Sequence, residues 1–290
     1  MDSTKFLKIE KITDETPFVK TFYFNHRLNS KPGQFVMLWL PGIDQKPFSI
    51  GWEDENGFAL TVFNRGPTTN KLFEMKAGER VGISGPYGTS FSVRPNTRYI
   101  MVAGGYGAAP LSFLAKQLSV IARSVATKQS QSTKIDFLLG ARSAEHVLFE
   151  DRLSKLPNTK IHIATDDGSK GHKGFVTDLL SSVIPAKAGI HDNSLDARFH
   201  GHDIFVCTCG PELMEKKVLD ACNVAGVECE ISIERYMKCG VGVCGQCAVD
   251  DLGLHMCKEG PVVSGALASQ IKEFGVYHRD KSGKKVYFEN

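Results

Sequence analysis

The chain has 290 residues, of which 23% are charged, and its formal net charge is +3 at pH 7. This small charge, without a run of Lys or Arg interleaved with aromatic residues, gives no sign of a nucleic-acid-binding surface. The N-terminus lacks the basic and apolar regions of a signal peptide, and no apolar run approaches the length that spans a membrane. We therefore predict a cytoplasmic protein with two domains and a small additional module.

Residues 1–95 carry short β-type runs that Gly, Pro and Asn interrupt, which is the pattern of a small antiparallel β-barrel. The predicted strands are 18–24, 34–40, 58–63 and 80–84. A tight turn predicted at 85–88 would end the barrel.

Two stretches of this domain carry side chains suited to a cofactor. The first follows a turn and consists of Lys46, Pro47, Phe48 and Ser49. Its cation could hold a pyrophosphate, its hydroxyl could bond a flavin edge and its ring could pack on the flavin, although an ordinary strand start explains the same residues. The second stretch, 65–69, precedes a helix predicted over 70–75. Free N–H groups at a helix start bind phosphate and Thr hydroxyls add donors, so the candidates, beside a plain N-cap, are Gly66, Thr68 and Thr69.

Residues 96–228 alternate strands and helices, which predicts a parallel sheet. The predicted strands are 98–103, 135–140, 160–165 and 204–207, with helices from Pro110, around 145–156 and after Pro211. A nucleotide site is expected where the first strand ends in a glycine-rich turn with Gly104, Gly105 and Gly107. This turn departs from the G-x-G-x-x-G fingerprint, because Pro110 replaces the third glycine and no acidic residue ends a second strand about 20 residues on.

Other strand ends would meet this turn along one crevice, and they carry Arg142, Asp166 and Gly210. Cys209 would lie near a reacting nicotinamide or serve as a structural thiol. The choice between NAD and NADP stays open, since Arg142 and Ser143 could meet a 2′-phosphate, whereas Asp166 or Asp167 could bond a free 2′-hydroxyl. The segment 184–203 fits neither period and resembles a translated palindromic repeat inserted into a surface loop, for which we predict no function.

The rest of the chain, 229–290, contains five cysteines, of which four lie at gaps of four, two and nine residues: Cys239, Cys244, Cys247 and Cys257. This spacing is that of a plant-type [2Fe–2S] site, whose loop needs glycines to turn backbone N–H groups toward the sulfurs. Structural zinc is the alternative, but zinc sites usually show two short cysteine pairs, and only 244 and 247 form one. The other four cysteines read as buried small hydrophobic residues: Cys207, Cys209, Cys222 and Cys229.

Together these residues resemble the ferredoxin-reductase superfamily, and within it the electron-transfer subunits of type B dihydroorotate dehydrogenases. The Arg-Pro-x-Ser flavin motif corresponds to 46–49 with Lys in place of Arg, and the Gly-x-Gly-Thr motif corresponds imperfectly to 66–69. The flavin-lining strand before it corresponds to Val62, Phe63 and Asn64. The turn at 104–107, Cys-Gly-Pro at 209–211 and the cluster loop match the family's remaining motifs.

The resemblance implies FAD in 1–95, NAD in 96–228 and one [2Fe–2S] cluster in 229–290. It implies transfer of electrons from an FMN-bearing dihydroorotate dehydrogenase subunit through the cluster and FAD to NAD⁺ in pyrimidine biosynthesis, in an assembly of two plus two subunits. Ser49 and Cys209 are then the candidate catalytic residues. The partner contact is expected at three exposed residues beside the first cysteine, Tyr236, Met237 and Lys238.

Three other interpretations share parts of this pattern. Flavin subunits of cytoplasmic hydrogenases and of anaerobic sulfite reductases have the same cluster loop. The small subunit of a bifurcating ferredoxin–NADP reductase places Asp where this chain has Cys239. A redox carrier or sensor that no longer reduces nicotinamide is the alternative outside enzymes.

Overall fold

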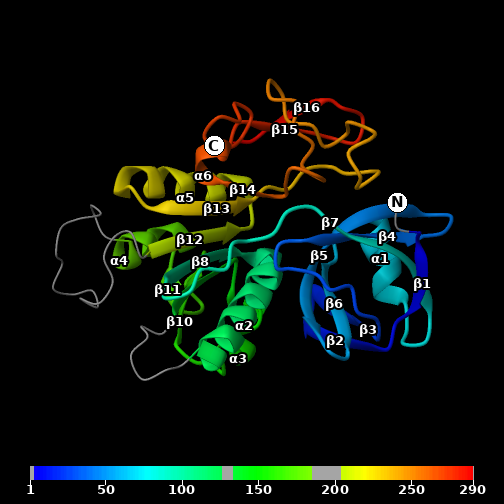
Figure 1. Cartoon of the computed structure of the whole chain (residues 1–290), viewed down its shortest axis with the longest axis horizontal. Helices are drawn as coiled ribbons and strands as arrows, with labels where there is room; N and C mark the ends of the chain where they lie inside the picture. Colours follow the sequence, from blue (N-terminus) through cyan, green and yellow to red (C-terminus); the bar gives the residue numbers. More distant parts are fainter. Residues whose placement is uncertain (1–2, 126–132, 185–203, 290) are drawn as a thin grey trace. The chain divides into compact units, whose positions relative to one another are not determined.

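The computed structural model describes residues 3–125, 133–184 and 204–289, and Figure 1 shows their elements in chain order. Apart from Ile184, the predicted insertion at 184–203 lies outside the described residues. The chain divides into two compact units: unit 1 holds Met1–Ser90, Ser232–Val263 and Ile271–Asn290, and unit 2 holds Phe91–Ile231 and Ser264–Gln270. The grouping assigns most of 229–290 to the same unit as the N-terminal segment, and the three-domain division stays a prediction.

Unit 1 contains a seven-stranded antiparallel sheet in the order β1-β7-β4-β5-β6-β3-β2. Its strands are β1 (Lys5–Lys8), β2 (Lys11–Thr16), β3 (Val19–Phe24), β4 (Phe35–Leu40), β5 (Asp44–Asp54), β6 (Gly57–Phe63) and β7 (Arg80–Tyr87). Helix α1 (Pro67–Glu74) follows β6. Only Ile9 and Glu10 separate the two edge strands β1 and β2, and their N–H groups donate to Glu79 and Tyr23 at 2.8 Å each, so the sheet curls back on itself as a barrel.

The barrel interior is apolar, as the alternation of its strands predicts. Fully buried side chains come from five of the strands, β3 to β7, and from α1, and they include Phe22, Leu38, Ile50, Leu60, Leu72 and Val81. The C-terminal part of unit 1 adds a two-stranded antiparallel sheet of β15 (Tyr277–Arg279) and β16 (Lys285–Tyr287).

Unit 2 is built on a sheet in the order β11-β10-β9-β8-β12-β13-β14, in which the pairs from β11 to β13 are parallel. The strands of this sheet are β8 (Arg98–Gly104), β9 (Lys134–Ala141), β10 (Thr159–Thr165), β11 (His172–Lys173), β12 (Ile204–Cys209), β13 (Glu228–Ser232) and β14 (Val262–Ser264), and the last two strands extend across the sequence boundaries of the units. The helical segments are η1 (Gly105–Gly107), α2 (Ala108–Val125), η2 (Ala144–His146), α3 (Glu150–Leu153), η3 (Val176–Leu179), α4 (Leu180–Val183), α5 (Glu212–Ala225) and α6 (Gly265–Ala268).

The strand order of unit 2 reverses between β8 and β12. The connection from β8 leads through α2 to β9 on one side, whereas β12 pairs on the other side of β8 and continues through α5 to β13. Right-handed crossovers in opposite directions place α2 and α5 on opposite faces of the sheet. The gap between the carboxyl ends of β8 and β12 is therefore the switch point at which such sheets bind ligands.

Three predicted elements were wrong in extent. The helix expected over 145–156 is replaced by η2 and α3, because Phe149 between them takes a left-handed conformation (φ 62°). The turn expected at 85–88 is a bulged continuation of β7, in which Gly85 (φ 123°) shifts the register against β4. Helix α1 begins at Pro67, earlier than the predicted start at 70.

No helix of the described ranges is long and apolar enough to cross a membrane.

Candidate functional site

The four cysteines of the loop in unit 1 lie in two pairs. The Cys244 N–H donates to Cys239 Sγ at 3.5 Å, and the Cys257 N–H donates to Cys247 Sγ at 3.4 Å. Cys247 and Cys257 are buried, with 2% and 1% of their surface exposed, whereas Cys244 is exposed. Within the described ranges, no three or more His, Cys, Asp or Glu side chains converge as ligands of one metal ion.

Backbone N–H groups of the loop point at the sulfur atoms. Those of Val241, Val243 and Cys244 donate to Cys239 Sγ at 3.4–3.5 Å, and that of Gly242 donates to Cys257 Sγ at 3.1 Å. Burial acts to raise the pKa of Cys239, but these N–H groups outweigh it and lower the pKa to about 6. The loop thus stabilises a thiolate, the form of cysteine that binds metal.

Burial and the hydrogen bond with Cys247 instead raise the pKa of Cys257 to about 12. This thiol therefore holds its proton more firmly than that of Cys239, and a metal ion bound to the sulfur would have to displace that proton. Two thiol pairs with inward N–H groups fit a two-iron cluster, in which each iron takes two of the four cysteines, better than one tetrahedral zinc.

Glycines shape this loop, as predicted. Gly240, Gly242 and Gly245 all have positive φ angles, between 69° and 76°. A Cβ on Gly240 would lie 2.7 Å from Met37 Cγ on β4, so only glycine lets the loop approach the sheet this closely.

The first flavin stretch occupies β5, and its cation already has partners. Lys46 Nζ lies 2.8 Å from Asp44 Oδ2 and donates to the Tyr236 hydroxyl at 2.8 Å. Burial lowers the pKa of Lys46, but its hydrogen bonds to Asp44 and Tyr236 prevail and raise the pKa above its ordinary value. The ammonium group therefore stays charged, but it shares its charge with Asp44.

The other residues of this stretch lie half-buried on β5 beside β4. Pro47, Phe48 and Ser49 are opposite Met37, Val36 and Phe35, respectively. On β6, Val62 is buried and Phe63 half-buried, and Asn64 follows the strand. The Asn64 Oδ1 atom is buried and has no hydrogen-bond partner in the described part of the chain, which fits a donor supplied by a bound group such as a flavin.

The second flavin stretch forms the start of α1. The Thr69 hydroxyl accepts from the N–H groups of Arg65 and Gly66 at 2.8 and 2.9 Å and donates to the Gly66 carbonyl. Thr68 is buried, and a Cβ on Gly66 would meet no atom within 4 Å. The Thr69 hydroxyl thus caps the helix, and the open approach at Gly66 leaves room for a phosphate at the helix start.

In unit 2 the glycine-rich turn meets the segment after β12. A Cβ on Gly107 would lie 2.0 Å from the Cys209 carbonyl oxygen, and one on Gly104 would lie 2.5 Å from Pro211 Cδ. Gly104, Gly107, Cys209 and Gly210 are buried, whereas Gly105 is exposed, with no atom within 4 Å of its Cβ position. The structure therefore brings the two predicted nicotinamide motifs together at the switch point and leaves the backbone of Gly105 accessible.

Arg142 and Asp166 follow neighbouring strands at the same edge of the sheet. Both are exposed, and the Asp166 N–H donates to Ala141 O at 3.1 Å. Asp167 differs, because hydrogen bonds from the Ser169 hydroxyl and N–H lower its pKa and commit it to its own turn. Of the two acidic residues here, Asp166 is the better candidate for a ribose hydroxyl.

Sequence reasoning missed one residue of this site and misplaced another. Glu215 on α5 is fully buried and accepts the Gly210 N–H at 3.0 Å, so a carboxylate orients the turn after Cys209. The sequence does not single it out, because an acidic residue in the first turn of a helix is ordinary. Met237, expected at an exposed partner contact, is 4% exposed, and Tyr236 is half-buried beside Lys46, which leaves only Lys238 exposed of the three residues.

Two protein-family models match this chain, one at the cysteine loop and one in unit 2. Residues 234–267 match the iron–sulfur cluster binding domain of dihydroorotate dehydrogenase B, and residues 101–220 match the oxidoreductase NAD-binding domain. A probable dihydroorotate dehydrogenase B (NAD⁺) electron transfer subunit of Methanocaldococcus jannaschii is 42% identical over 288 residues, covering 99% of this chain and all of the relative. The corresponding protein of Methanocella arvoryzae is 39% identical, over 96% of each chain.

The fold has a solved relative as well. The structure of an NADH-dependent reduced ferredoxin–NADP oxidoreductase, which performs flavin-based electron bifurcation, superposes with a TM-score of 0.73 at 25% identity, over 92% of this chain and 90% of that one. These matches confirm the predicted mixed fold, the assignment as an oxidoreductase subunit, and FAD, a [2Fe–2S] cluster and NAD as its cofactors. The chain belongs to the family of dihydroorotate dehydrogenase B (NAD⁺) electron transfer subunits.

Proposed function

We propose that this chain takes electrons from an FMN-containing dihydroorotate dehydrogenase subunit and delivers them to NAD⁺, in a heterotetramer of two plus two subunits. The observation that carries the proposal is the pairing of Cys239 with Cys244 and of Cys247 with Cys257, by hydrogen bonds from backbone N–H to sulfur, inside a loop whose other N–H groups also face the sulfurs. When bound, the cluster supplies one-electron transfer and FAD exchanges hydride with nicotinamide. Cytoplasmic localisation stays a prediction.

The four cysteines are the proposed cluster ligands. N–H groups directed at Cys239 and Cys257 compensate negative charge on the sulfurs, and such hydrogen bonds raise the potential of an iron–sulfur site. Cys244 is exposed, so we propose that the partner contacts the loop at this residue. The segment 236–238, where the sequence predicted the contact, is largely covered.

The flavin site is proposed on β5, β6 and the start of α1. Lys46 offers a positive charge held in place by Asp44, and the Ser49 hydroxyl is available for a flavin edge. Asn64 offers its unpartnered amide oxygen to a flavin N–H, and the open helix start at Gly66 takes a phosphate. Pro47, Phe48, Val62 and Phe63 supply apolar contact, with Thr68 and Thr69 shaping the helix start.

The nicotinamide site is proposed at the switch point of unit 2. The accessible backbone at Gly105 fits the close approach of a dinucleotide, while Gly104, Gly107 and Gly210 keep the two turns in contact. Asp166 is proposed to bind the adenosine ribose, with Arg142 beside it, and Cys209 to lie against the nicotinamide.

Native purification tests this function. The chain is tagged at its chromosomal locus and isolated anaerobically, and the co-purifying subunit, iron, acid-labile sulfide, FAD and FMN are measured. We expect a dihydroorotate dehydrogenase subunit with FMN, two iron and two sulfide per tagged chain, and NAD⁺ reduction by dihydroorotate. Recovery of a hydrogenase or siroheme subunit, or of zinc in place of iron and sulfide, would refute the proposal.

A further inference from the structure

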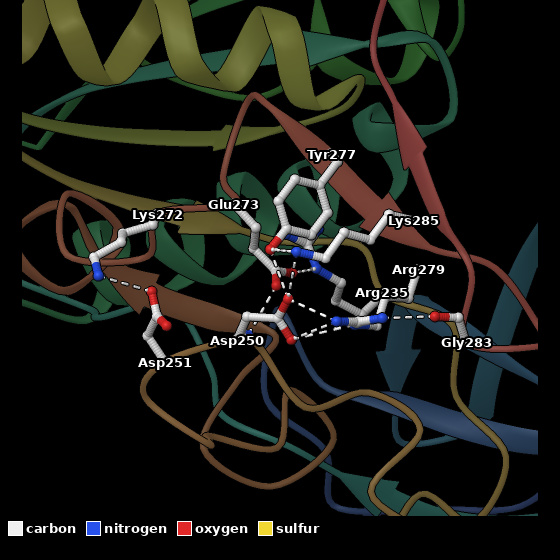
Figure 2. A network of polar contacts seen from close by, with 9 residues as sticks. All are labelled: Arg235, Asp250, Asp251, Lys272, Glu273, Tyr277, Arg279, Gly283 and Lys285. Atoms are coloured by element: carbon white, nitrogen blue, oxygen red, sulfur yellow. Dashed lines mark hydrogen bonds and ion pairs between the residues drawn. The ribbon is translucent and has the colours of Figure 1, made fainter.

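The C-terminal segment 273–287 contacts the cluster loop through groups that take no part in ligation (Figure 2). Gln246, directly before the third cysteine, donates its side-chain N–H to Asp280 O at 3.1 Å. Asp250, three residues after that cysteine, donates its backbone N–H to Glu273 Oε2 at 2.8 Å. The segment therefore holds the chain on both sides of Cys247.

Glu273 also reaches the chain before the first cysteine. Its second oxygen, Oε1, lies 2.8 Å from Nε of Arg235, and the two side chains are only 1% and 3% exposed. One buried carboxylate thus joins position 235, before the loop, to position 250, within it. Either charge buried without its partner would strongly destabilise the fold, so this pair favours a fixed position for both side chains.

A second carboxylate, that of Asp250, faces the β15–β16 pair. It accepts a hydrogen bond from the Tyr277 hydroxyl at 2.6 Å. Arg279 donates to it from Nε at 3.2 Å and from Nη2 to both carboxylate oxygens at 2.8 and 3.1 Å, and Lys285 Nζ lies 3.4 Å away. Arg279 Nη1 donates to Gly283 O at 2.6 Å, which ties the same guanidinium to the turn between β15 and β16. All three nitrogen atoms of the guanidinium donate hydrogen bonds, in a fixed planar geometry that the single ammonium group of a lysine could not reproduce.

We propose that segment 273–287 is a positioning clamp for the iron–sulfur cluster, in which Glu273 and Arg279 hold the two flanks of the ligand loop so that Cys247 and Cys257 keep their pairing. The inference rests on the proposed function, because it assigns a role toward the cluster of this chain. Glu273 and Arg279 contact no cysteine sulfur in any described hydrogen bond, so they act through Arg235 and Asp250 as positioning residues.

The test compares Arg279→Gln, Arg279→Lys and Tyr277→Phe in the full chain with its cluster. Arg94→Gln is the matched control, because Arg94 also pairs with a carboxylate, that of Glu228, at 2.5 Å but lies in unit 2. The measurements are the rate of iron release to a chelator, followed by the visible absorbance of the cluster, and the EPR line shape and midpoint potential of the reduced cluster. Circular dichroism establishes that each variant is folded.

We expect Arg279→Gln to release iron roughly tenfold faster than the wild type, because a charge-assisted bidentate contact is lost. Arg279→Lys should restore part of the difference, Tyr277→Phe should accelerate release about two- to threefold, and Arg94→Gln should match the wild type. A shifted EPR line shape in Arg279→Gln would separate positioning of the ligands from a general loss of stability.

Unchanged release and EPR signals in Arg279→Gln and Tyr277→Phe would overturn the inference and leave the proposed function standing. The same acceleration in Arg94→Gln would also overturn it, since the effect would then not come from the clamp. A wild type that holds zinc without sulfide would instead refute the proposed function, and the clamp with it.

Discussion

Replacing Gly107 with Ala should disable the nicotinamide site while leaving the other cofactors in place. The added Cβ would lie 2.0 Å from the Cys209 carbonyl oxygen, about 1.4 Å short of an ordinary contact at 3.4 Å. Backbone lies on both sides of this contact, so no side-chain rotation can relieve it, and the two turns must separate. A displacement of about 1 Å in a site that orients reactants costs on the order of 100-fold in rate, which we expect here in kcat/KM for NADH.

The assay is NADH-dependent dye reduction by the chain loaded with FAD and cluster, with the flavin and iron contents measured on the same sample. Gly107 belongs to unit 2, whereas the cluster cysteines and the proposed flavin residues belong to unit 1, so both contents should equal those of the wild type. Val224→Ala, at an 82% exposed position of α5, is the control and should keep full activity. A kcat/KM for NADH within about threefold of the wild type would refute the placement of this site.

Three further predictions concern carboxylates. Glu273→Ala leaves Arg235 buried without its partner and should lower the free energy of unfolding by roughly 3–5 kcal/mol in urea titrations, and a loss below about 1 kcal/mol would contradict it. Hydrogen bonds from Arg279 and Tyr277 lower the pKa of Asp250 from 3.8 to about 2, so its stabilising contribution is complete above about pH 4 and is lost as the pH falls through about 2. The difference in unfolding free energy between the wild type and Asp250→Asn should therefore shrink as the pH falls over that range. A constant difference would count against the pairing. Glu215→Gln should raise KM for NADH with normal flavin and iron contents, because an amide holds the Gly210 N–H more weakly than a carboxylate, and an unchanged KM would show that the turn needs no charge.

The cysteine spacing and the apolar strand runs carried the prediction of the fold and of the cluster loop. Both signals are local. The alternation of apolar and polar residues within a strand indicates which face is buried, and an iron–sulfur loop has glycines between its closely spaced ligands. The strands missed by sequence reasoning have weaker local signals. β2 has one apolar residue among six and lies at a sheet edge, and β1 has four residues of which only one is even half-buried.

The partners of charged residues were out of reach, because they depend on contacts between distant positions. Lys46 was a candidate cation for a pyrophosphate, but nothing in the sequence indicated that its ammonium also meets the Tyr236 hydroxyl, 190 residues away. Met237 was expected on the surface from its place beside a metal ligand, but in the fold it is buried. Such burial is decided by which chain segments pack together, and no period in a single sequence encodes that choice.

The packing of unit 1 gives the cluster loop a fixed relation to the proposed flavin strands. Gly240 lies against Met37 on β4, and Tyr236 bonds Lys46 on β5, so the start of the loop contacts the two strands that carry or neighbour the flavin candidates. The loop is also held by Glu273 and Arg279, through Arg235 and Asp250. Since the protein's contribution to electron transfer is the spacing and environment of its cofactors, these contacts inside one compact unit give the proposed cysteine ligands a fixed place relative to the proposed flavin site.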